Sequence, residues 1–106
     1  MMATGDIAIP CFNKLAKTGE LLGLITQPDR PVGRHQTLTP PRIKVCAQEA
    51  GIPVFQPERM RDAEAVEQLR ALQPDLVVVM AYGQILSQEV IDVPTIACIN
   101  AHASLL

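Results

Sequence analysis

The chain has 106 residues, of which 48% are hydrophobic and 3% aromatic, with no tryptophan and a formal net charge of −2. This length suits one domain with an aliphatic core. No apolar run approaches the roughly 18 residues of a membrane span, and the N-terminus lacks the features of a signal peptide, so we expect a cytoplasmic protein that does not enter a membrane.

The first predicted element is a helix over residues 7–17, with Phe12 and Leu15 facing inward. In an α/β arrangement such a helix normally follows a strand, but only MMATGD precedes it. Residues 1–3 are therefore either the tail of a strand or a sign that the sheet lacks a member.

Four short apolar runs have the length of strands and are too short for typical helices. Two of them, LLGLI and LVVVM, are apolar without alternation, which is typical of parallel strands covered by helices on both faces. The predicted strands span residues 21–26, 52–55, 75–81 and 96–100.

Helical patterns with start and stop signals lie between these runs. The segment PPRIKVCAQEAG has Thr39 as a candidate N-cap and Gly51 at its end. The segment DAEAVEQLRALQP opens at Asp62 and is closed by Pro74. A short helix is predicted to begin at Ser87.

Strands that alternate with helices predict an open α/β sheet, mainly parallel, with helices on both faces. Sheets of this kind bind ligands in the crevice beyond the carboxyl ends of their strands. We therefore expect function in the segments that follow the strands, namely TQPDRPVGRHQTLTPP, YGQIL and NAHASLL.

Asn100 and His102 form the most specific candidate pair. At the end of a strand, residues two apart project to the same side. There the amide could stabilise an oxyanion while the imidazole moves a proton. The alternative is a capping asparagine beside a hydrogen-bonded loop histidine. Ser104 is less favoured as a nucleophile, because no G-x-S-x-G motif surrounds it.

The stretch TQPDRPVGR is rich in turn-forming residues and predicts a shaped loop. Arg30 and Arg34 in it could face an anionic partner, whereas the alternative is a surface loop whose arginines face water. Positive charge is concentrated between residues 26 and 45. The charged residues there are Arg30, Arg34, Arg42 and Lys44, against Asp29.

The turn AYGQIL follows a predicted buried strand and could offer an apolar shelf to a flat heterocycle, or be an ordinary strand-to-helix turn. No dinucleotide-binding or P-loop motif is present. The three cysteines include no C-x-x-C pair, so we expect reduced thiols and no metal site. The shelf residues would be Tyr82, Gly83, Ile85 and Leu86.

Taken in order, TGDIAIP, LITQPDRPVGR, AGIPVFQP, PDLVVVMAYGQIL and CINAHASLL resemble the N-terminal part of the catalytic domain of the methionyl-tRNA formyltransferase family. The N-x-H-x-S-L-L element is shared with a wider group of folate-dependent formyltransferases, and TQPDRPxGR favours the tRNA enzymes. The resemblance implies a Rossmann-like fold, with residues 1–106 as a partial formyltransferase N-terminal domain.

The same resemblance implies that a formyl group passes from 10-formyltetrahydrofolate to the methionyl amine of initiator tRNA, in an enzyme that is monomeric when complete and uses no metal. Asn100 would polarise the formyl oxygen and His102 would assist proton movement. Arg34, with Arg30 nearby, would contact the tRNA acceptor end. Folate contacts would come from Ser104, Leu105 and Leu106, and from the shelf residues Tyr82, Gly83, Ile85 and Leu86.

The family's downstream catalytic aspartate has no counterpart in this sequence. We therefore expect residues 1–106 to be part of a longer enzyme and to have little formyl transfer activity alone. Two alternatives stay open at this point. One is a non-catalytic α/β binding domain, and the other is a folate-dependent formyltransferase that acts on a sugar nucleotide or a purine precursor.

Overall fold

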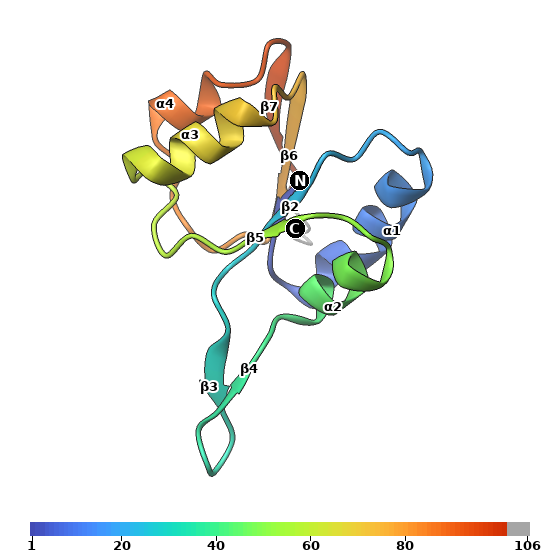
Figure 1. Ribbon diagram of the computed structural model, residues 1–106, viewed down its shortest axis with the longest axis vertical. Coiled ribbons are helices and arrows are strands. Elements are labelled where there is room, and N and C mark those ends of the chain that lie inside the picture. The colour runs from blue at the N-terminus through green and yellow to red at the C-terminus, as the bar shows by residue number, and fades with distance from the viewer. Residues whose placement is uncertain (102–106) are drawn as a thin grey trace, which may run out of the picture.

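The computed structural model describes residues 1–101, and these form a five-stranded parallel sheet with helices on both faces (Figure 1). All four strands predicted from the apolar runs are present, each within its predicted range, and one further strand joins them. The strands of this sheet are β1 (Met2–Ala3), β2 (Leu24–Ile25), β5 (Val54–Phe55), β6 (Leu76–Met80) and β7 (Ala97–Asn100).

The sheet has the order β5-β2-β1-β6-β7, so the chain builds β2 and β5 on one side of β1 and then β6 and β7 on the other. Met2 of β1 is level with Ile25 of β2 and with Val79 of β6. The direction of winding reverses at β1, which is where sheets of this class bind ligands. The predicted α/β fold class is confirmed.

The additional strand is β1, formed by the first residues of the chain. Met2 and Ala3 are completely buried at the centre of the sheet. The amino group of Met1 donates to the carbonyl oxygen of Gly23 at 3.0 Å, and burial lowers the pKa of this amino group to about 6. Of the two readings of residues 1–3, the structure supports a strand.

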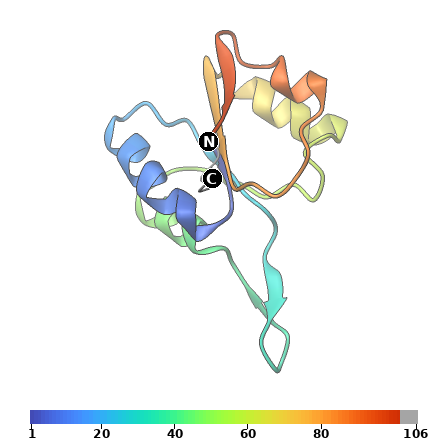
Figure 2. The ribbon, with the colours of Figure 1, turned by 180° about the vertical axis from the view of Figure 1, so that it is seen from behind.

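The helices cover opposite faces of the sheet, as the two views in Figures 1 and 2 show. The helices are η1 (Asp6–Ala8), α1 (Ile9–Lys17), α2 (Arg42–Glu49), α3 (Ala63–Ala71) and α4 (Gln88–Ile91). Alternation along the strands places Met2 and Ile25 in the cluster beneath α3 and α4, and Ala3 and Leu24 in the cluster beneath α1 and α2.

Most predicted helix ends agree with the structure. Helix α3 begins after Asp62 and ends before Pro74. The hydroxyl of Ser87 caps α4 by accepting from the backbone N–H of Val90 at 3.3 Å. Phe12 of α1 is buried as predicted. None of the helices in residues 1–101 is both long enough and apolar enough to cross a membrane.

Thr39 is not the N-cap of α2, so that prediction is wrong. The capping position is Pro41. Thr39 lies in a strand and its hydroxyl donates to the carbonyl oxygen of Thr37 at 3.0 Å. The physical reason is that Pro40 follows Thr39, and a residue before proline is pushed into extended backbone.

The segment predicted to be a loop contains a hairpin of two short strands, β3 (Arg30–Val32) and β4 (Thr37–Thr39). Arg30 is opposite Thr39, and Val32 is opposite Thr37. Gly33 opens the turn with a φ of +77°, a left-handed conformation that glycine adopts without strain. The hairpin extends away from the body of the molecule (Figure 1), and every residue in its two strands is exposed.

Candidate functional site

The carboxyl ends of three strands are joined by the hydroxyl of Thr4, which directly follows β1. This hydroxyl donates to the carbonyl oxygen of Tyr82, after β6, at 2.8 Å. It accepts from the backbone N–H of Gln27 at 3.1 Å and from the hydroxyl of Thr26 at 3.3 Å, both after β2. The carboxyl ends of β1, β2 and β6 are therefore held together by hydrogen bonds from the residue after the central strand.

The chain leaves β6 through Ala81, which has a φ of +49°. A left-handed conformation costs a residue other than glycine roughly 1 kcal/mol or more. Here the carbonyl oxygen of Ala81 accepts from the backbone N–H groups of Thr4 and Gly5, each at 3.0 Å. These two hydrogen bonds stabilise the strained turn and fix the direction of the segment that follows.

A glutamine from that segment connects it to two other parts of the chain. Nε2 of Gln84 donates to Oε1 of Gln27 at 2.7 Å and to the carbonyl oxygen of Glu58 at 3.0 Å. Oε1 of Gln84 accepts from the backbone N–H of Met60 at 2.7 Å. Gln27 is only 6% exposed, so the contact between the two amides lies largely inside the protein.

A second branch of the network anchors the start of the hairpin. Nε2 of Gln56 donates to Oδ1 of Asp29 at 2.7 Å and to the carbonyl oxygen of Gln27 at 3.1 Å. Nζ of Lys44 lies 3.1 Å from the same carboxylate oxygen. The hydrogen bond from Gln56, followed by that from Lys44, lowers the pKa of Asp29.

Sequence reasoning did not identify these glutamines. A signal was present, because Gln27, Gln56 and Gln84 each follow a predicted strand closely, in TQP, FQP and YGQ. In parallel sheets such positions gather at one edge.

The cations between residues 26 and 45 do not form one patch. Lys44 is held by the carboxylate of the hairpin base, and NH1 of Arg42 lies 3.3 Å from Oδ2 of Asp6. Arg30 and Arg34 are exposed on the hairpin and form no ion pair within residues 1–101. The positive charge that stays unpaired in this region is therefore on the hairpin.

Asn100 is the last residue of β7 and is exposed. It is paired with Val79 of β6. Cys98, two residues earlier in β7, packs against the cluster beneath α3. Alternation places Asn100 on that same face, next to the carboxyl end of β6. The expectation that His102 projects to the same side stays a prediction. The residues His102, Ser104, Leu105 and Leu106 lie outside the described residues.

The four residues of the expected apolar shelf differ in accessibility. Tyr82 is 2% exposed and Ile85 is 95% exposed. Leu86 is half-buried against the core, while Gly83 is exposed and has a φ of +95°. The hydroxyl of Tyr82 is buried with no hydrogen-bond partner in the described part of the chain, and burial raises the pKa of Tyr82 to about 12. Of these four residues, Gly83 and Ile85 are therefore the most accessible.

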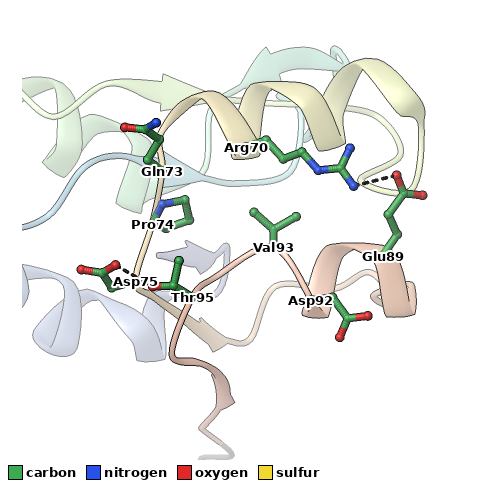
Figure 3. A pocket seen from close by; sticks show the side chains of 8 residues that line it. All are labelled: Arg70, Gln73, Pro74, Asp75, Glu89, Asp92, Val93 and Thr95. Atoms are coloured by element: carbon green, nitrogen blue, oxygen red, sulfur yellow. Dashed lines mark hydrogen bonds and ion pairs between the residues drawn. The ribbon is translucent and has the colours of Figure 1, made fainter.

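A cavity of about 680 Å³ lies at the opposite edge of the sheet (Figure 3). Asp75 on its wall directly precedes β6, and Thr95 lies just before β7. The hydroxyl of Thr95 donates to Asp75 at 2.6 Å, and Arg70 pairs with Glu89 at 3.3 Å. These polar groups already have partners, and the amino ends of strands are not where this fold class binds substrates.

The described residues contain no cluster of three or more histidine, cysteine, aspartate or glutamate side chains that could hold a metal ion. The three cysteines, Cys11, Cys46 and Cys98, are free thiols and half-buried. Burial raises the pKa of Cys98.

Comparison with known proteins agrees with the motifs. A family model described as formyl transferase matches residues 5–106. The chain is 67% identical to a methionyl-tRNA formyltransferase of Akkermansia muciniphila, with 99% of this chain and 33% of the relative covered. It is 53% identical to a methionyl-tRNA formyltransferase of Geobacter metallireducens, with 99% and 34% covered. The chain therefore spans about a third of the length of the curated relatives it matches, and the resemblance inferred from its motifs is confirmed.

Proposed function

This chain belongs to the formyl transferase family, and from that premise we propose that the protein carrying it transfers the formyl group of 10-formyltetrahydrofolate to the methionyl amine of initiator tRNA. The observation that carries the proposal is the 67% identity, across 99% of the chain, to a relative named methionyl-tRNA formyltransferase. A cytoplasmic monomer without a bound metal is the form of the enzyme that we propose.

In this reaction the amine nitrogen bonds to the formyl carbon, the bond from that carbon to the folate nitrogen breaks, and the folate nitrogen gains the proton that the amine loses. The side-chain amide of Asn100 donates to the formyl oxygen as negative charge develops there. His102 carries the proton. The exposure of Asn100 at the carboxyl edge supports its role, whereas the role of His102 rests on the family resemblance.

The proposed contact with tRNA is made by the hairpin. Phosphate binding depends on local positive charge and can therefore occur in a protein whose net charge is −2. Arg30 and Arg34 supply that charge, since both are exposed and unpaired in residues 1–101. The formyl donor is proposed to contact Gly83 and Ile85, together with Ser104, Leu105 and Leu106.

A chimera tests this function directly. Residues 1–106 of this chain replace the matching segment of the Akkermansia muciniphila relative, which is 67% identical over that segment. The purified chimera is assayed with 10-formyltetrahydrofolate and three acceptors: methionyl-tRNA, glycinamide ribonucleotide and an amino-sugar nucleotide. We expect transfer to methionyl-tRNA alone.

The unmodified relative is the positive control, and a thermal unfolding curve establishes that the chimera is folded. A folded chimera that formylates another acceptor, or none while the relative is active, would contradict the proposal.

A further inference from the structure

We propose that Gln27 and Gln84 are positioning residues for formyl transfer, and that their paired amides hold residues 81–86 in the orientation in which Gly83 and Ile85 bind the formyl donor. This inference rests on the proposed function, because it takes that segment as part of the donor's binding surface. Neither glutamine needs to touch the reacting atoms.

The side chain of Gln84 connects three segments that are far apart in sequence. Gln84 itself follows β6, its Nε2 donates to Gln27 after β2 at 2.7 Å, and its Oε1 accepts from the backbone of Met60 at 2.7 Å. Met60 belongs to the connection between β5 and α3. The position of residue 84 is thus fixed from two sides, and Ile85 is the next residue in the chain.

Amides suit this task better than apolar side chains would. A buried amide oxygen that lacks a donor is costly, so the hydrogen bond from Nε2 of Gln84 to Oε1 of Gln27 favours only a narrow range of distances and angles. Apolar packing is non-directional and would allow the segment to shift. Gln27 is only 6% exposed, so water cannot readily take the place of Gln84 as its hydrogen-bond partner.

The backbone at Gly83 gives an independent indication of close approach. A Cβ atom on residue 83 would lie 2.9 Å from Nε2 of Gln27, which is too close for an unstrained contact. The φ of +95° also disfavours any side chain there. A side chain at residue 83 would therefore displace the amide of Gln27, and the glycine leaves room for that amide.

The chimera with Gln84→Met provides the test, because methionine has a similar length and removes all the hydrogen bonds of the amide. We expect the KM for 10-formyltetrahydrofolate to rise by about tenfold, which corresponds to the loss of roughly one net hydrogen bond. The KM for methionyl-tRNA should stay unchanged. Gln68→Met, at an exposed position on α3, is the matched control and should change neither value.

A double variant separates positioning from a general loss of stability. If the two amides act as a pair, Gln27→Met combined with Gln84→Met should raise the donor KM little more than Gln84→Met alone. Should Gln84→Met fail to fold, Gln27→Met removes the acceptor Oε1 and keeps the hydrogen bond from the backbone of Met60 to Gln84. The same selective rise in donor KM is expected from it.

An unchanged donor KM, or an equal rise in both KM values, would overturn the inference. Additive effects in the double variant would also contradict it. A folded wild-type chimera without any transfer would remove the proposed function and this inference together. An active wild-type chimera whose donor KM does not respond to Gln84→Met would remove this inference alone.

Discussion

Lys44 contacts Asp29 across the base of the hairpin, with Nζ 3.1 Å from Oδ1. Both side chains are partly shielded, at 18% and 32% exposed. Lys44 and Arg42 belong to the group of cations between residues 26 and 45 that could attract phosphate. Both are paired with a carboxylate, Lys44 with Asp29 and Arg42 with Asp6. The other two cations of the group, Arg30 and Arg34, are on the hairpin and form no ion pair within residues 1–101.

Replacing Arg34 should weaken tRNA binding selectively. If Arg34 contacts one phosphate, Arg34→Ala in the chimera should lower the slope of log affinity against log salt by about 0.7–0.9. Arg42→Ala is the matched control, because Arg42 is already paired with Asp6 and should leave the slope unchanged. Filter binding of methionyl-tRNA across a salt series measures both. Equal slopes for the two variants would exclude the proposed contact.

Thr4→Val should destabilise the chain although it preserves the shape of the side chain. The change removes the hydroxyl that joins β1 to the segments after β2 and β6, and it leaves the backbone N–H of Gln27 without this acceptor. We expect the free energy of unfolding to fall by about 1–3 kcal/mol. Thr37→Val, at an exposed position on β4, should change it by less than about 0.5 kcal/mol. Urea unfolding measures both variants. An equal loss of unfolding free energy in the two would show that the Thr4 hydroxyl does not stabilise the junction of the three strands.

Unlike Thr4→Val, Tyr82→Phe should not destabilise the chain. The Tyr82 hydroxyl is buried without a hydrogen-bond partner in the described residues, and burying an unpaired hydroxyl is unfavourable. Phenylalanine keeps the ring in the core and removes that cost. The free energy of unfolding should therefore stay the same or rise by up to about 1 kcal/mol. A clear loss of stability in urea unfolding would mean that the hydroxyl has a stabilising partner.

The free energy of unfolding of a polypeptide that begins at Met1 should depend on pH, because the amino group of Met1 is buried. Its pKa is about 6 in the folded chain and 8.0 as the reference value, so the unfolded state binds more protons between these values. The free energy of unfolding should rise from pH 6 to pH 8, by an amount of the order of 2 kcal/mol, and then level off.

Acetylation of the amino group is the control for this rise. It removes the titrating group and leaves the histidines unchanged, so the acetylated chain should lose the rise. Identical pH profiles for the two forms, measured by urea unfolding, would show that the amino group does not contribute.

The strands and most helix ends could be predicted because their signals are local. Apolar runs mark β6 and β7, and Asp62 and Pro74 bound α3. The hairpin could not be predicted in this way, since its strands are fully exposed and carry no buried periodic face. Its short length adds to the difficulty.

The amide network was missed for a different reason. The contact between Gln27 and Gln84 exists because β1 lies between β2 and β6, and strand order is not written in any local pattern. Asn100 could be proposed from the sequence because its motif is continuous there, and its catalytic role stays a prediction. Residues that act through neighbours from distant segments can be recognised only when the fold is known.

The most direct test of the proposed chemistry is the kcat of Asn100→Ala in the chimera. Because Asn100 is exposed at the end of β7, the substitution should leave the thermal unfolding midpoint unchanged. Loss of an oxyanion donor should lower kcat by about 10²–10³-fold. Asn13→Ala, an exposed asparagine on α1, should have the kcat of the unaltered chimera. If Asn100→Ala instead turns over as fast as Asn13→Ala, the carboxyl edge of the sheet is not where the formyl group reacts.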